Sequence, residues 1–88
     1  MIYDVVIIGA GPAGTSTAIG LAERGVRVAL LDKSRFPRVK PCAEYANPEA
    51  MRILDRLGLL ESVRASGAAV FRGMRVTSPG GQELDLDY

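Results

Sequence analysis

The chain's 88 residues suffice for one small domain but not for a complete doubly wound α/β protein. Its 11 basic and 10 acidic residues leave a net charge of +1, which argues against a nucleic-acid partner, and no segment approaches the ~20 apolar residues of a membrane span. Because the one cysteine excludes an internal disulfide and histidine is absent, we expect a cytoplasmic protein without a metal site.

The first predicted element is a strand over residues 5–8, which are β-branched throughout, as is typical of a parallel strand covered on both faces. Gly9, Gly11 and Gly14 follow it with the spacing G-x-G-x-x-G. In this motif the first glycine permits a tight turn, the second lets the backbone approach a pyrophosphate, and the third lets the helix pack closely on the strand. The pattern therefore predicts a phosphate-binding turn.

A helix is predicted over residues 12–24, and Pro12 suits its first turn, where the missing N–H would have no partner. The free N–H groups at the start of this helix would favour a pyrophosphate, and Gly25 is expected to end it. A second apolar strand, residues 26–31, leads into Asp32. This acid follows the glycines at close to the offset of about 20 residues at which a carboxylate meets a ribose hydroxyl. Together these elements predict a dinucleotide site, with a glycine-rich structural turn as the alternative.

Residues 33–47 lack periodicity, and Pro37 and Pro41 mark them as an extended loop. The loop leaves the C-terminal end of the second strand, which is the edge where α/β sheets bind ligands. Its basic residues, including Arg38 and Lys40, are suited to contact a charged cofactor. A solvated surface loop is the competing interpretation.

A second helix is predicted to begin at Asn47-Pro48-Glu49, with asparagine as N-cap, proline at the first helical position and an acid near the helix dipole. It is expected to stop at Gly58, and a shorter helix is expected over residues 59–66. We interpret the apolar residues of both helices as packing surfaces and their charged residues as solvated faces.

Period-two alternation over residues 74–77 and 83–88 predicts an antiparallel hairpin. A hairpin after a βαβ start suggests that a second sheet opens here. We therefore divide the chain into residues 1–67, the N-terminal part of a Rossmann-like domain, and residues 68–88, the beginning of another sheet. One helix cannot cover both faces of two parallel strands, so the domain is expected to be incomplete without the remainder of the same protein or a second chain.

With the glycine motif, Asp32 and the loop in view, the sequence resembles flavoproteins of the para-hydroxybenzoate-hydroxylase fold. Within that group it is most similar to the branch of geranylgeranyl reductases, flavin monooxygenases and halogenases. Members of this branch carry a segment like Phe36-Pro37-Arg38…Lys40-Pro41-Cys42, followed by Gly-Glu. Here Ala43 takes the place of that glycine, before Glu44.

The resemblance implies an α/β fold in which a Rossmann-type βαβ start of an FAD-binding domain precedes helices and a hairpin that opens the substrate-domain sheet. It implies FAD as cofactor, NAD(P)H as reductant and a small hydrophobic or aromatic substrate. The reaction would be oxygenation or reduction, and no catalytic acid or base can be named. An NAD-binding dehydrogenase and a non-catalytic nucleotide-binding subunit are the alternatives, although the loop and the early hairpin favour FAD.

The roles implied by the resemblance divide the cofactor between two groups of residues. The pyrophosphate would be lined by the turn, namely Gly9, Gly11, Pro12, Ala13 and Gly14. The adenosine would be held by Asp32 at the ribose, with Lys33 beside the adenine.

The loop would contribute the remaining contacts that the resemblance implies. Arg38 and Lys40 would lie near the phosphates or the ribityl chain, and Cys42 and Glu44 near the approach to the flavin ring. Cys42 could react with the flavin if the neighbouring cations activate its thiol. A small packed thiol is the alternative.

Overall fold

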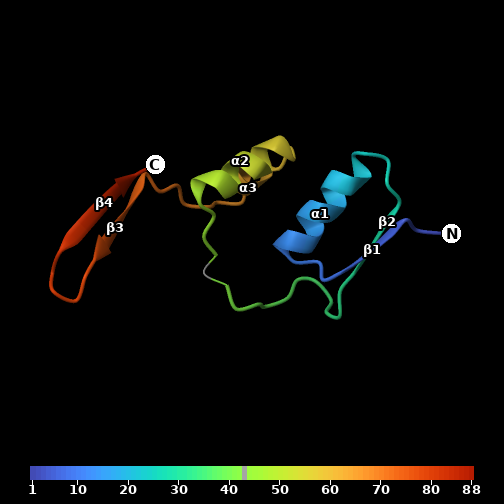
Figure 1. The fold of residues 1–88 in the computed structure, drawn as a ribbon, viewed down its shortest axis with the longest axis horizontal. Coiled ribbons are helices and arrows are strands. Elements are labelled where there is room, and N and C mark those ends of the chain that lie inside the picture. The colour runs from blue at the N-terminus through green and yellow to red at the C-terminus, as the bar shows by residue number, and fades with distance from the viewer. Residues whose placement is uncertain (43) are drawn as a thin grey trace. The chain divides into compact units, whose positions relative to one another are not determined.

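In the computed structural model, residues 1–42 and 44–88 are described and form two compact units, Met1–Tyr45 and Ala46–Tyr88. Ala43, which replaces the glycine expected from the resemblance, lies outside the described residues. The elements, labelled in Figure 1, are β1 (Val5–Ile8), α1 (Pro12–Ala22), β2 (Val28–Leu31), α2 (Pro48–Arg56), α3 (Leu60–Ala65), β3 (Gly73–Thr77) and β4 (Glu83–Asp87).

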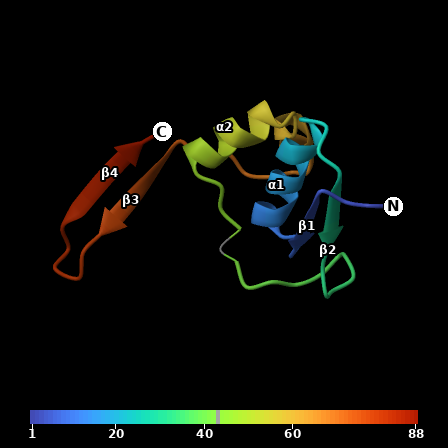
Figure 2. The same cartoon turned by 45° about the vertical axis from the view of Figure 1, so that its right-hand side comes forward.

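The first unit is a βαβ motif, as predicted. β1 and β2 pair in parallel, in a register that sets Val5 opposite Val28 and Ile8 opposite Leu31. Helix α1 connects the two strands and packs beside them (Figure 2). Because the strands are parallel and in register, their C-terminal ends meet at one edge. This edge positions the site described below.

The predicted end of α1 and the predicted start of β2 each differ from the structure by two residues. α1 ends at Ala22, and β2 begins at Val28. The residues between them form a capping turn, because the N–H of Val26 bonds to the carbonyl of Leu21 at 3.1 Å. Gly25 has a φ of 78°, the left-handed conformation that glycine adopts easily. Residues that the sequence pattern assigns to the helix and the strand therefore lie in this turn.

The two helices of the second unit begin and end where local capping signals predict, to within one residue. Asn47 caps α2, since its Oδ1 accepts the N–H of Ala50 at 2.8 Å. Gly58 follows α2 with a φ of 73°, and Gly67 follows α3 with a φ of 86°. Both helices therefore stop where a left-handed residue is available.

The predicted antiparallel hairpin is formed by β3 and β4. Met74 pairs with Leu86 and Val76 pairs with Leu84, which places four apolar side chains on one face. Arg75 lies opposite Asp85, and its Nε bonds to that carboxylate at 2.7 Å. The division of the chain at residues 67 and 68 remains a prediction.

Apolar side chains are not enclosed in the part of the chain that the structure describes. None of the hydrophobic residues there is buried, and Ile8 of β1 is 86% exposed. A parallel sheet normally has both faces covered. One face of β1, with Val6 and Ile8, is therefore uncovered, as expected for an incomplete domain. Among the described helices, none has the length and hydrophobicity required to cross a membrane.

Candidate functional site

The turn between β1 and α1 has the backbone geometry that its glycines predict. Gly9 has a φ of 107°, and its N–H bonds to the carbonyl of Leu31 at 2.7 Å. A methyl group placed on Gly14 would overlap the carbonyl oxygen of Gly9. Gly9 therefore allows the turn, and Gly14 allows the helix to approach it closely.

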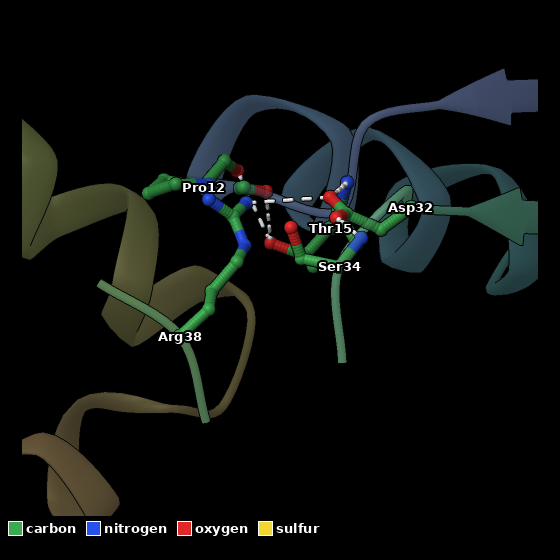
Figure 3. Close-up of polar contacts among 7 residues, drawn as sticks. Pro12, Thr15, Asp32, Ser34 and Arg38 are labelled. Carbon is green, nitrogen blue, oxygen red and sulfur yellow. Dashed lines mark hydrogen bonds and ion pairs between the residues drawn. The ribbon is translucent and has the colours of Figure 1, made fainter. Parts of the chain in front are cut away.

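Asp32 is held at the end of β2 by two backbone N–H groups and one arginine. Its Oδ2 accepts the N–H of Ala10 at 2.9 Å, and its Oδ1 accepts the N–H of Ser34 at 2.8 Å. Arg38 reaches Oδ2 from the following loop, with its Nη2 at 3.3 Å (Figure 3). The N–H groups of Ala10 and Ser34 lower the pKa of Asp32 below its ordinary value of 3.8. The carboxylate therefore stays ionised at neutral pH.

A pocket of about 490 Å³ opens beside this carboxylate. Its lining combines an acid and two hydroxyl residues with aliphatic and aromatic side chains, namely Ala10, Thr15, Leu30, Asp32, Ser34 and Phe36. The Thr15 hydroxyl donates to the carbonyl of Gly11 at 2.8 Å. Apolar walls with a few placed polar groups are the usual surroundings of a small ligand. The pocket has the chemistry to take a sugar hydroxyl against Asp32 and a flat ring against the apolar wall.

Two cations from the loop flank the first turn of α1. A methyl group built on Gly11 would lie 3.3 Å from Lys40 Nζ and 3.7 Å from Arg38 Nη2. The Arg38 guanidinium also lies 4.9 Å from the centre of the Phe36 ring. Since a helix N-terminus already favours negative charge, these cations complete a cradle for an anion such as a phosphate group.

The Arg38 side chain is largely buried, with 20% of its surface exposed. Within the described residues its Nε is buried and has no hydrogen-bond partner. A buried donor without an acceptor costs free energy. The present position of Arg38 therefore leaves part of its hydrogen-bonding capacity unused.

The structure brings most of the predicted site residues to one edge of the first unit. The turn supplies Gly9, Gly11, Pro12, Ala13 and Gly14, the ion pair supplies Asp32 and Arg38, and Lys40 lies beside Gly11. Lys33 follows Asp32 and is exposed. Further along the loop, Cys42 and Glu44 are exposed, and the Glu44 N–H lies 3.3 Å from the Cys42 sulfur.

Five residues of the pocket were not predicted from the sequence: Ala10, Thr15, Leu30, Ser34 and Phe36. Ser34 had a local signal, because an aspartate often accepts the N–H two residues further on. Thr15 follows the last glycine of the motif, where a first-turn side chain can reach the ligand edge. In residues 1–42 and 44–88, no group of three or more acidic or cysteine side chains is arranged to hold a metal ion.

Comparison with known proteins connects this geometry to one family. Residues 2–87 match the family described as FAD binding domain. The menaquinone reductase of Mycobacterium tuberculosis is 38% identical over 97% of this chain and 20% of its own length. The 6-methylpretetramide 4-monooxygenase of Streptomyces rimosus is 34% identical over 97% of this chain and 20% of its own. The solved structure of the myxobacterial chondrochloren halogenase, a variant of FAD-dependent halogenases, gives a TM-score of 0.84 at 30% identity, over 98% of this chain and 20% of that one. This chain thus spans about a fifth of the length of these relatives.

Proposed function

Because the chain belongs to the FAD binding domain family, we propose that it is the N-terminal FAD-binding part of a flavin-dependent oxidoreductase. The observation that carries the proposal is the Asp32 carboxylate, held by the N–H groups of Ala10 and Ser34 beside the glycine turn. The residues present fit FAD, since the turn accepts close approach and the flanking side chains are cationic.

The proposal assigns the adenosine diphosphate half of FAD to the first unit. The turn before α1 and the first turn of the helix bind the pyrophosphate, as helix N-termini do, through Gly9, Gly11, Pro12, Ala13 and Gly14. Asp32 accepts hydrogen bonds from the ribose hydroxyls, and Lys33 lies beside the adenine.

The loop extends the proposed site toward the rest of the cofactor. Arg38 and Lys40 neutralise phosphate charge, and their proximity to Gly11 supports this role. Cys42 and Glu44 are proposed to lie near the flavin ring. Their exposure is compatible with such a contact.

When bound, FAD supplies the oxidation–reduction chemistry, and the protein supplies its position and electrostatic surroundings. The relatives include a reductase, a monooxygenase and a halogenase. The activity proposed for the whole protein is therefore flavin-dependent oxidation–reduction, with NAD(P)H as reductant and a small hydrophobic or aromatic substrate. The cytoplasm, where NAD(P)H is abundant, is its proposed location.

The remainder of the same protein, or a second chain, is proposed to cover the exposed apolar faces and to complete the enclosure of the flavin. In this arrangement residues 1–67 belong to the FAD-binding domain, and residues 68–88 open the sheet of the substrate domain. The exposure of Ile8 supports a missing covering element. The family match and the FAD-dependent halogenase favour this reading over an NAD-binding dehydrogenase.

The test is to purify the complete protein that contains this chain, denature it, and identify the released nucleotide by chromatography. We expect FAD in a near-stoichiometric amount. NAD in its place, or a protein that neither contains nor binds FAD, would contradict the proposal. Native mass spectrometry of the 88-residue chain alone is expected to show little or no retained FAD.

A further inference from the structure

The hydrogen-bonding capacity of Asp32 limits what this carboxylate can bind at one time. A carboxylate offers about four acceptor positions on its two oxygens. Oδ2 already accepts from Ala10 N–H and from Arg38 Nη2, while Oδ1 accepts from Ser34 N–H. One acceptor position is left, whereas the two hydroxyls of a ribose bring two donors. Arg38 and a ribose therefore compete for Asp32.

Arg38 is the member of this group that can leave without disturbing the carboxylate. Its bond to Asp32 is 3.3 Å long, against 2.9 Å and 2.8 Å for the two backbone N–H groups. Those N–H groups hold both oxygens, so the orientation of Asp32 does not depend on the guanidinium. The buried, unpartnered Nε shows that the present position does not satisfy Arg38 completely.

A second place for the guanidinium lies next to its present one. A methyl group on Gly11 would be 3.7 Å from Arg38 Nη2, so the guanidinium already borders the first turn of α1. A phosphate bound at this turn would accept charge-assisted hydrogen bonds from arginine, which are the stronger kind. A short movement of the side chain thus exchanges a carboxylate partner for a phosphate partner.

We propose that Arg38 is an exchange residue, which pairs with Asp32 as in this structure and transfers to the pyrophosphate when a dinucleotide binds, freeing Asp32 for the ribose. The inference rests on the proposed function. It implies that Arg38 opposes the binding of a phosphate-free nucleoside and supports the binding of a nucleoside diphosphate. The contribution of Arg38 to affinity therefore has opposite signs for the two ligands.

The experiment compares adenosine with ADP on the flavin-free form of the complete protein. In Arg38→Met, the affinity for ADP should fall about tenfold or more, as expected for the loss of a charge-assisted contact. The affinity for adenosine should rise, because its competitor for Asp32 is gone. Calorimetric titration measures ADP, and ligand-detected NMR measures adenosine. Adenosine affinity that is unchanged or reduced in Arg38→Met overturns the exchange.

Lys40→Met is the matched control. Lys40 also borders Gly11, but the hydrogen bonds and ion pairs of the described residues do not join it to Asp32. This variant should weaken ADP binding and leave adenosine binding unchanged. A rise in adenosine affinity in Lys40→Met would mean that general removal of positive charge, rather than release of Asp32, explains the effect, and would overturn the proposal.

A measurement on the wild-type protein keeps the proposal falsifiable if the variant does not fold. Inorganic pyrophosphate should draw Arg38 away from Asp32 and so raise the affinity for adenosine, because two ligands that favour one arrangement are coupled. Unchanged or reduced adenosine affinity in pyrophosphate overturns the exchange. A wild-type protein that binds neither FAD nor ADP refutes the proposed function itself. If the protein binds ADP normally but Arg38→Met does not change the affinities for ADP and adenosine in opposite directions, only the exchange is refuted.

Discussion

The two units differ in how far along the sequence their polar contacts reach. In the first unit, Asp32 bonds to Ala10 across 22 positions, and Asp4 bonds to Arg27 across 23. In the second unit, the Arg75–Asp85 pair joins positions 10 apart, and the Arg64–Glu61 pair joins positions three apart. The first unit is thus tied together by long-range contacts at both ends of its strands, and only the Ala10–Asp32 contact lies at the ligand edge. The contacts of the second unit support individual helices and a hairpin.

The two arginine–aspartate pairs illustrate the consequence of this difference. The side chains of Arg38 and Asp32 are 20% and 11% exposed, whereas those of Arg75 and Asp85 are 60% and 61% exposed. Exposed pairs are screened by solvent and contribute little to stability. The same chemistry therefore builds a site in the first unit and a surface contact in the second.

The largest expected effect comes from Gly14→Ala. The added methyl would overlap the carbonyl oxygen of Gly9, so α1 must move away from the turn. We expect FAD binding to be lost. The free energy of unfolding of the complete protein should fall by about 1–3 kcal/mol, the usual cost of overpacking. Chemical denaturation and flavin content measure the two effects.

Gly20→Ala is the matched control, because Gly20 lies in the same helix and the nearest atom to its added methyl is Arg24 Nη1, at 3.7 Å. Alanine is the better helix former by about 1 kcal/mol. This variant should keep its flavin and be slightly more stable. Equal loss of flavin in both variants would show that the glycine turn is not the sensitive feature.

Separate substitutions of Asp32 and Asp85 by asparagine compare the aspartate of the site with that of the exposed ion pair. Asp32→Asn removes the negative charge and an acceptor, so the affinity for FAD should fall about tenfold or more. Asp85→Asn removes the corresponding carboxylate of the exposed pair, and FAD affinity should not change. Flavin fluorescence titration gives both dissociation constants. Comparable losses in the two variants would contradict the assignment of the site to the first unit.

The pH dependence of stability separates Asp32 from other carboxylates. The N–H groups of Ala10 and Ser34 hold its pKa below 3.8, so its ionised form is favoured by folding. The resulting stability is fully present above pH 3.8 and is lost as the pH falls through the lower pKa of the folded state. Denaturation of wild type and Asp32→Asn at a series of pH values should give a difference that is constant above 3.8 and shrinks below it. A difference that grows with acidity would refute this account.

The smallest effect is expected for Asn47→Ala in the second unit. It removes the cap on the Ala50 N–H, a hydrogen bond of 2.8 Å, and should cost about 1 kcal/mol of unfolding free energy. FAD affinity should be unaffected, because the site residues belong to the first unit. Asn47→Asp, which keeps a capping oxygen, should retain most of the stability. Loss of FAD affinity in Asn47→Ala would instead link this cap to the site.

Local signals determined which elements form. The β-branched run of β1, the asparagine cap of α2 and the left-handed glycines after α2 and α3 depend on neighbouring residues, so the sequence alone predicts them. The end of α1 was misplaced because a helical pattern continues into residues that the capping turn uses. Phe36 was missed because its place beside the pocket depends on the path of an irregular loop.

For the site, the sequence by itself determined the glycine turn and Asp32. Each depends on the residue type at one position, because a left-handed turn needs a glycine and the carboxylate is the residue that follows the second strand. Only the tertiary structure decided that Ala10 holds one oxygen of Asp32 and that Arg38 returns to the same carboxylate, whereas the contact with Ser34 is local. The contact with Ala10 exists because the parallel register brings the ends of β1 and β2 to one edge. Residues distant in sequence become partners only once that register is formed.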